Sequence, residues 1–298
     1  MIDINILQNA AEIIQYDSSD IPYTIQTRKL SNFTDMRALC HWHDDIEIIH
    51  IFNGEMIYDI NGKTLHLRAG DTVIVNSHQM HFGYSHNDNE CIFTCMLFHP
   101  DLLKSNIFMY QKYVQPIIST SAIEYWYFPA KKSTKNDFPA KFIEDFYNKY
   151  QSGNMLDYEV VGKFYLIWNE IYKNSDEKLY INPTAQSPDI HIQKEMITYI
   201  TSHYYENIEL DDIAAAGNIS RSKCCQIFKT YMHESPIAYL NAYRMELSCT
   251  LLKTTSYSIT SIATSCGFNH LSYFSKIFLK KFGCTPMEYR KSNALNHF

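Results

Sequence analysis

The last hundred residues of the chain contain an internal repeat, and no other feature limits the possible folds as strongly. Landmarks of the first copy recur in the second, namely Ile213-Ala214 as Ile262-Ala263, Cys224 as Phe274, Phe228 as Phe278, Pro236 as Pro286 and Tyr239 as Tyr289. The offset is 49 before the turn and 50 after it, so one copy has a single extra turn residue. Self-similarity at a nearly fixed offset indicates a duplicated structural unit.

Each copy is predicted to fold as a short helix, a turn and a longer helix. In the second copy we expect Ser258 to cap the short helix. Gly267 can take the left-handed conformation of the turn, because it lacks the Cβ atom that would clash there. Asn269 is expected to cap the longer helix, which runs to Phe282 and ends at Gly283.

The longer helix of the second copy has an apolar face and a polar face. Spacing of three and four residues predicts one buried side formed by Leu271, Phe274, Ile277, Phe278 and Phe282. Hydrogen-bond donors predominate on the other side, at Ser272, Tyr273, Ser275, Lys276 and Lys280. A helix with both faces can anchor itself in a small core and present its polar side to a ligand. We interpret it as a recognition helix for the major groove of DNA.

The first copy follows the same plan, with Cys224 in the apolar place that Phe274 fills in the second. Between the copies, residues 236–253 are predicted to form one uninterrupted helix. At about 1.5 Å per residue this helix is roughly 27 Å long. A rod of that length can hold two reading helices about one turn of duplex apart.

The run GFNHLSYFSKIFLKKFGCTPMEYR resembles the signature of AraC/XylS-type transcription regulators. The matching residues are Gly267, Phe268, Phe274, Phe278, Gly283, Pro286, Tyr289 and Arg290. The resemblance covers residues 190–292 and implies seven helices, two helix-turn-helix units and sequence-specific binding to an asymmetric site on double-stranded promoter DNA. It departs from the family at Asn218, where glycine is common, and at Cys224, where leucine is usual.

The resemblance and the polar faces together give the predicted DNA contacts. These are Arg221, Ser222, Cys225 and Gln226 in the first unit, and Asn269, Ser272, Ser275 and Lys276 in the second. Charge supports this only mildly: residues 190–298 carry 11 Lys/Arg against 8 Asp/Glu, and the preceding 189 residues carry 15 against 24. The C-terminal third is therefore the part of the chain that suits a polyanion.

The sequence pattern of residues 20–100 predicts short strands separated by turns. Asn53-Gly54 and Asn61-Gly62 are both hairpin signals, since both positions accept positive φ. Regularly spaced short strands predict an antiparallel sandwich or small barrel. Small barrels hold one small ligand in their mouths.

Histidines and a carboxylate in this region resemble the motifs of cupin barrels. His41, His43, Glu47 and Gly54 match the first motif, and Gly70 with His81 resembles part of the second, although Asn76 and His78 replace its usual proline and glycine. The resemblance implies that three imidazoles and one carboxylate can surround zinc, manganese or iron. One interpretation is that these residues bind a metal ion in a metalloenzyme or metal sensor. The other is that they belong to the barrel framework or line a pocket.

We favour a sensor that binds a small molecule, with no catalytic residues, no resident metal and no cofactor. The predicted pocket residues are His41, His43, Glu47, His81, Phe93 and Cys95. The last two lie on a strand resembling one that lines the sugar pocket of the arabinose-responsive family member, so sugars are the first effector class to test. A regulator switched by a protein partner is a further alternative.

Two amphipathic helices are predicted between these regions, at residues 138–150 and 155–172. Their stripes are Phe138, Phe142, Phe146 and Tyr150 on the first and Val161, Phe164, Trp168 and Ile171 on the second. Family resemblance implies that such a pair forms a homodimer interface, and covering the barrel is the alternative. The family also favours activation over repression, with RNA polymerase as a partner.

The 298 residues are therefore predicted to be a multi-domain α+β protein. We expect a cupin-like antiparallel β-barrel at 1–137, a helical pair at 138–174, a linker at 175–189 and an all-α double helix-turn-helix domain at 190–298. No apolar stretch reaches eighteen residues and no signal peptide is recognised, so we expect no membrane contact and a cytoplasmic location. The eight cysteines form no CxxC pair, which predicts reduced thiols.

Overall fold

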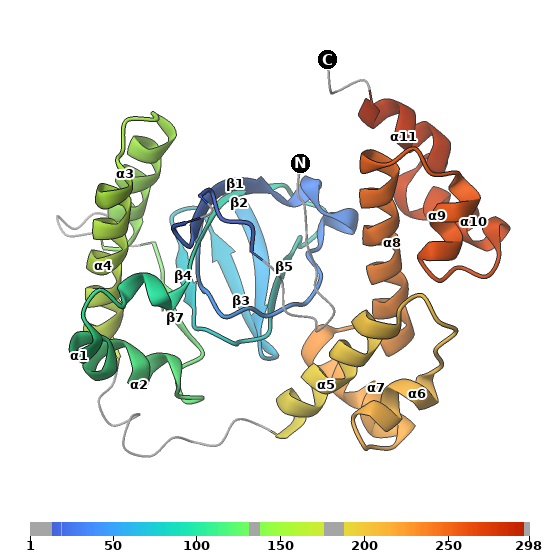
Figure 1. Cartoon of the computed structure of the whole chain (residues 1–298), viewed down its shortest axis with the longest axis horizontal. Coiled ribbons are helices and arrows are strands. Elements are labelled where there is room, and N and C mark those ends of the chain that lie inside the picture. Colours follow the sequence, from blue (N-terminus) through green and yellow to red (C-terminus); the bar gives the residue numbers. More distant parts are fainter. Residues whose placement is uncertain (1–13, 19, 131–137, 176–187, 295–298) are drawn as a thin grey trace. The chain divides into compact units, whose positions relative to one another are not determined.

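The computed structural model describes residues 14–18, 20–130, 138–175 and 188–294, and the chain divides into two compact units between Pro188 and Asp189 (Figure 1). An antiparallel β unit comes first and an all-α unit second, which confirms the predicted fold class. The predicted linker at 175–189 falls mostly outside the described residues.

The described part of the β unit contains seven strands. They are β1 (Tyr23–Lys29), β2 (Ile46–Ile60), β3 (Lys63–Arg68), β4 (Thr72–Val75), β5 (His81–Tyr84), β6 (Cys91–Phe98) and β7 (Tyr125–Phe128). The order β1-β6-β2-β4-β7 makes one sheet, and β3 and β5 both pair with the second half of β2. The long strand β2 is thus shared by two antiparallel sheets.

Strand β2 bends at Gly54 instead of turning back. The register with β6 shifts between Ile51 and Asn53, and Gly54 has φ 81°. A Cβ atom at Gly54 would lie 2.1 Å from the carbonyl oxygen of Glu90, so only glycine fits. The predicted hairpin at Asn53-Gly54 is therefore wrong, because the two residues belong to an irregularity within one continuous strand. The hairpin at Asn61-Gly62 is confirmed, with φ values of 51° and 79°.

Strands β2, β4 and β6 bury both of their faces, with the alternation that a pleated strand requires. Ile49, Ile51, Val73, Val75, Phe93, Cys95 and Leu97 contribute to one core. Ile46, Ile48, Ile74, Met96 and Phe98 belong to a second core together with α3 (Ala140–Gln151) and α4 (Asp157–Lys173). Two short helices, α1 (Ile107–Met109) and α2 (Gln115–Ile118), flank a π-helical turn at Tyr110–Val114, and 3-10 turns occur at Leu30–Asn32, Thr34–Met36 and Pro100–Leu103.

The predicted stripes on α3 and α4 are used within the unit. Phe146, Phe164 and Ile171 have no exposed surface, and Trp168 is 5% exposed, because all four pack in the core between the sheet and these helices. Burial of this size removes these four side chains as a surface for a second chain, whereas the other four stripe residues, Phe138, Phe142, Tyr150 and Val161, are only partly buried. The structure agrees with the alternative interpretation, in which these side chains cover the sheet.

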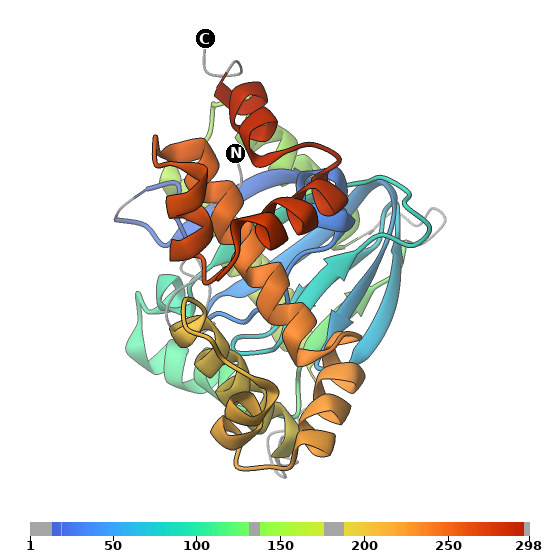
Figure 2. The same ribbon diagram turned by 90° about the vertical axis from the view of Figure 1, so that its right-hand side faces the viewer.

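The C-terminal unit consists of seven helices in its described part. These are α5 (Pro188–His203), α6 (Leu210–Ala216), α7 (Arg221–Met232), α8 (Pro236–Thr254), α9 (Ile259–Ser265), α10 (Leu271–Phe282) and α11 (Pro286–Ala294). The repeat corresponds to the pairs α6–α7 and α9–α10. Helix α8 is uninterrupted, as predicted, and runs between the two pairs (Figure 2).

The turns follow the sequence signals with one exception. Asn218 and Gly267 both have positive φ, at 51° and 82°. The Ser258 hydroxyl accepts the Ser261 amide at 3.0 Å and so caps α9 as predicted. Asn269 does not cap α10, because His270 is the N-cap residue and the Asn269 side-chain amide donates to Asn207 Oδ1 at 3.2 Å.

The core of the second helix-turn-helix unit, around α9 and α10, is aromatic, as expected. Phe274 and Phe278 are fully buried, and Tyr289 of α11 packs against Phe278 and Phe282 with ring centroids 5.4 Å apart in both cases. Leu271 is 40% exposed, so its predicted place in the buried face is wrong. It is the first residue of α10 and is not among the residues that pack in the aromatic cluster.

Candidate functional site

The polar face of α7 gathers the residues predicted to contact DNA in the first unit. Arg221, Ser222 and Gln226 are exposed or partly exposed, as is Cys225. On the opposite side Cys224, Ile227 and Phe228 are buried. Ser220 caps α7 by accepting the Lys223 amide at 3.3 Å, which fixes where the face begins.

The corresponding face of α10 is also open. Ser272, Ser275 and Lys276 all keep exposed or partly exposed side chains. Asn269 is exposed but precedes the helix and is hydrogen-bonded to Asn207. Each unit therefore presents its predicted polar residues on the side of the longer helix that faces away from its core.

Two ion pairs on α7, made by Arg221 and Lys223, were not predicted from the sequence. Arg221 Nε lies 3.0 Å from Asp211 Oδ1 of α6, and Lys223 Nζ lies 2.8 Å from Asp189 Oδ2 of α5. Spacing along one helix could not reveal these pairs, because both partners lie on other helices.

A second cluster lies in the β unit, where the four polar pocket residues come together. Glu47 is on β2, His81 is on β5, and His41 and His43 precede β2. The backbones of His41 and His81 form a bridge, with N to O distances of 3.2 and 2.9 Å. One potential ligand atom from each of the four residues lies within 4.8 Å of those of the others, which confirms that they converge.

Glu47 is the centre of this histidine–glutamate cluster. Its Oε2 lies 3.0 Å from His43 Nε2 and 2.9 Å from His81 Nε2. Its Oε1 accepts the hydroxyl of Tyr58 at 2.9 Å. Tyr58 was not predicted as a site residue, and only its place on the same strand as Glu47 could have suggested it. His43, Glu47 and His81 are buried, while His41 is partly exposed.

The second nitrogen of each imidazole is already engaged. His41 Nδ1 lies 2.8 Å from Leu39 O, His43 Nδ1 lies 3.1 Å from Asp45 O, and His81 Nδ1 lies 2.8 Å from Gln79 O. A carbonyl oxygen only accepts, so each Nδ1 carries the proton. The Nε2 atoms near Glu47 therefore carry a lone pair in the neutral rings, or a proton in the charged ones.

A bare Nε2 and a carboxylate oxygen repel each other at this distance, so the cluster needs a cation between them. Burial alone would raise the pKa of Glu47, but the charges and hydrogen bonds of His81 and His43 outweigh it and hold that pKa well below its usual value. Protons on the imidazoles supply the cation in one state. A metal ion that displaces those protons would supply it in another.

The donor set fits a metal of the zinc, manganese or iron type. Imidazole nitrogen and carboxylate oxygen are ordinary ligands for these ions. In a tetrahedral zinc site neighbouring ligand atoms are about 3.3 Å apart, given bonds of about 2.0–2.1 Å. Glu47 Oε2 lies 3.0 and 2.9 Å from two imidazole nitrogens, close to that value, and all four potential ligand atoms lie within 4.8 Å of one another. Backbone carbonyls on the Nδ1 atoms are the outer partners that orient imidazole ligands in such sites.

Phe93 and Cys95, the other two predicted pocket residues, face the same interior as Glu47. Strand β6 pairs Leu97 with Glu47, Cys95 with Ile49 and Phe93 with Ile51. At about 3.4 Å per residue, Cys95 and Phe93 lie roughly 7 and 14 Å along the strand from the position opposite Glu47. Both belong to the apolar core, so the structure places them beneath the cluster and not within it.

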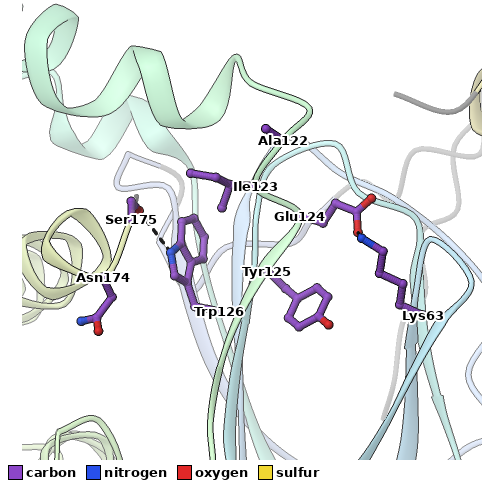
Figure 3. A pocket seen from close by; sticks show the side chains of 8 residues that line it. All are labelled: Lys63, Ala122, Ile123, Glu124, Tyr125, Trp126, Asn174 and Ser175. Atoms are coloured by element: carbon purple, nitrogen blue, oxygen red, sulfur yellow. Dashed lines mark hydrogen bonds and ion pairs between the residues drawn. The ribbon is translucent and has the colours of Figure 1, made fainter. Parts of the chain in front are cut away.

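A shallow pocket of about 350 Å³ lies elsewhere on the β unit, at β7 and the end of α4 (Figure 3). Tyr125 and Trp126 line it, and the Trp126 indole donates to Ser175 Oγ at 3.2 Å. Its two charged residues neutralise each other, since Lys63 Nζ lies 2.6 Å from Glu124 Oε2. The histidine–glutamate cluster therefore offers the stronger ligand chemistry.

Family models match both units of the chain. The helix-turn-helix domain matches residues 213–292, and the AraC-like ligand binding domain matches residues 33–116. The first match begins within α6 and covers the rest of both repeats, and the second contains the whole histidine–glutamate cluster. The matched domains are those of transcriptional regulators and not of enzymes.

Known proteins resemble the chain over its full length or over part of it. The uncharacterized HTH-type transcriptional regulator YdeC of Bacillus subtilis is 27% identical over 289 residues, which cover 96% of this chain and 98% of that protein. The xylose operon regulatory protein of Escherichia coli is 36% identical over 96 residues, which are 32% of this chain and 24% of that protein. Among solved structures, ToxT of Vibrio cholerae is 15% identical and covers 90% of this chain and 97% of its own, with a TM-score of 0.45.

Hydropathy adds one finding on the described residues. None of their helices combines the length and the apolar composition needed to cross a membrane.

Proposed function

The chain belongs to the AraC family of transcriptional regulators, and from this premise we propose that it activates promoters in response to an effector bound at the histidine–glutamate cluster. The observation that carries the proposal is the convergence of three imidazoles on one buried carboxylate inside the matched ligand-binding domain. A group so arranged can be protonated or occupied by a ligand, and each state places a different charge in the interior.

Helices α7 and α10 are proposed to read the DNA. Their open polar residues are Arg221, Ser222, Cys225 and Gln226 on α7, and Ser272, Ser275 and Lys276 on α10, with Asn269 before it. Arg and Lys serve phosphates unless they point at guanine, whereas Ser and Gln can reach base edges. The function places the protein in the cytoplasm, with RNA polymerase as its partner at the promoter.

A homodimer remains part of the proposal, but through a surface other than the predicted stripes. Tyr158 is 92% exposed and Leu166 is 54% exposed on α4, and Gly162 lies between them at helical spacing. An apolar strip beside a residue without a side chain permits close helix approach. Light scattering at micromolar concentration tests it, with Leu166→Lys as the disrupting variant and a strict monomer as the contrary result.

A small molecule is the effector class that the matched domain implies, and a transition metal ion is the second candidate. The engaged Nδ1 atoms and the short Nε2–carboxylate distances favour the metal. A sugar gains less support, because the residues beneath the cluster belong to an apolar core. The metal also fits a sensor better than an enzyme, since both matched domains are regulatory.

Thermal unfolding of the full chain separates these effectors. The panel contains sugars, Zn²⁺, Mn²⁺ and Co²⁺, each with and without chelator. A ligand at a hundred times its dissociation constant adds about 2.7 kcal/mol to stability, which raises the midpoint by a few degrees. Glu47→Gln should abolish a metal-induced shift. Glu55→Gln is the matched control, because Glu55 also pairs with a histidine, His66, at 3.0 Å but on the outside of the unit.

The outcomes assign the effector. A shift with one sugar that survives chelator makes the effector a sugar, and a shift with metal that Glu47→Gln abolishes makes it a metal. A metal shift that survives in Glu47→Gln contradicts the cluster as its site. If no member of the panel shifts the midpoint, the effector is another molecule or a protein partner.

A further inference from the structure

The two reading helices lie in very different charge environments. Residues 209–232, which contain α6 and α7, carry three cations and three carboxylates. Residues 258–283, which contain α9 and α10, carry three cations and no carboxylate. The repeat therefore gives both units the same shape, but only the second has a net positive charge.

The carboxylates of the first unit are placed directly on its cations. Arg221 is 64% exposed and bound to Asp211, which is 61% exposed. Lys223 is 37% exposed and bound to Asp189, which is 28% exposed. Both cations are in the first turn of α7, the part of a recognition helix that lies deepest in the groove.

Such pairs are weak in water but matter beside a polyanion. Forming an exposed ion pair changes an equilibrium constant by at most about fivefold. DNA affinity depends on how many phosphates the protein neutralises, since each contact releases counterions. A carboxylate about 3 Å from a cation cancels that cation toward the phosphates and also repels them.

Lys276 of α10 has a different setting. It keeps an open side chain, and the described structure shows no carboxylate paired with it. It occupies the place that Gln226 occupies on α7, given the offset of 50. The corresponding site thus bears an unpaired charge in one unit and no charge in the other.

We propose that Asp211 and Asp189 compete with DNA phosphates for Arg221 and Lys223, so that the second helix-turn-helix unit anchors the protein and the first binds more tightly once these ion pairs open. The inference rests on the proposed function, because it takes α7 and α10 as the reading helices. Asp189 is the second residue of α5, directly after the segment that connects the two units.

The test uses the full chain and a fluorescein-labelled duplex of random sequence, with anisotropy measured over a salt series. We compare Asp211→Asn, Asp189→Asn, Lys276→Gln and the control Glu195→Gln. Glu195 is also on α5, and its removal changes the net charge equally, but its partner is His191 at 3.4 Å and not a residue of α7. Urea unfolding of each variant confirms that it is folded.

Asp211→Asn and Asp189→Asn should each bind about twofold to fivefold more tightly at low salt. The slope of log K against log salt should become steeper by up to about 0.9 per released cation. Glu195→Gln should keep the wild-type slope, and Lys276→Gln should lose about 0.9 from it.

Contrary results separate the two claims. If both aspartate variants match Glu195→Gln, or bind more weakly, the ion pairs do not restrain α7 and the inference is wrong. A reduced slope for Lys276→Gln in the same experiment would leave the proposed function intact. A wild-type protein that binds no duplex at any salt would remove the proposed function and the inference together.

Discussion

In the first helix-turn-helix unit the central core position of the reading helix is Cys224, whereas in the second it is Phe274, and both are fully buried. A phenyl ring buries far more apolar surface than a thiol. Phe268 and Phe278 extend the second cluster, with ring centroids 5.1 and 5.6 Å from that of Phe274. The first unit has ion pairs on α7 instead. One repeated pattern is thus stabilised mainly by packing in one copy and has additional electrostatic contacts in the other.

The largest effect should come from truncating the two core positions. Phe274→Ala removes a fully buried ring and should lower the free energy of unfolding of the C-terminal unit by about 3–5 kcal/mol. Cys224→Ala removes one sulfur atom and should cost about 1 kcal/mol. Urea unfolding of the full chain measures both. Equal losses would mean that the two cores depend on these positions to the same extent.

The next largest difference in the free energy of unfolding should come from substitutions in the two turns. A Cβ at Gly267 would lie 2.2 Å from the carbonyl oxygen of Tyr204 and 2.9 Å from Arg244, and its φ of 82° disfavours side chains. Gly267→Ala should therefore cost about 3 kcal/mol, from strain and displaced neighbours. Asn218→Ala replaces a residue that already has a side chain, so only the cost of left-handed φ, about 1 kcal/mol, applies. Urea unfolding again measures both variants, and a Gly267→Ala variant as stable as Asn218→Ala would show that the second turn can relax.

Positions 226 and 276 are equivalent in the two copies, and exchanging their residues tests how each reading helix contributes to DNA binding. Lys276→Gln should weaken binding about fivefold, roughly uniformly across sequences, with a smaller salt slope. Gln226→Lys adds a cation to the first unit, which has no net charge, and should strengthen binding by less than that. Anisotropy on several unrelated duplexes measures both changes. A Lys276→Gln variant that alters base preference while keeping its slope would mean that Lys276 contacts a base.

The smallest difference in stability should come from substitutions at the N-terminal ends of the two reading helices. Ser220→Ala removes the hydroxyl that accepts the Lys223 amide and should cost about 1 kcal/mol. Asn269→Ala removes an exposed hydrogen bond to Asn207 and should cost about 0.5 kcal/mol or less. Unfolding midpoints should rank the two in this order. The reverse order would restore Asn269 as an essential element of the second turn.

The sequence predicted those features that depend on local conformation. Gly267 was identified because few residues accept positive φ, and α8 was identified because its sequence contains no break. Asn53-Gly54 was misread for the same reason, since a bulge and a hairpin require the same positive φ. Leu271 and Asn269 were misplaced because α10 begins slightly later than the pattern indicated.

The sites were predictable only in part. His41, His43, Glu47 and His81 were identified through their resemblance to the cupin motifs, and the structure brings them together. The Tyr58 hydroxyl on Glu47 and the backbone partners of the imidazoles depend on how strands pair, which spacing does not encode. The partners of Arg221 and Lys223 lie on separate helices, so they required the tertiary structure.

Affinity cleavage tests the inequality of the two reading helices most directly. An iron chelate is attached at Cys225 of α7 or, in a Cys225→Ser background, at Ser275→Cys of α10, with Cys284 replaced by serine in both. Each protein is bound to a duplex selected from a random pool, and DNA cleavage is followed as salt is raised. We expect two cut regions about one helical turn apart, with cleavage from position 275 persisting to higher salt than cleavage from position 225. Loss of both at the same salt, or earlier loss from position 275, would contradict the account.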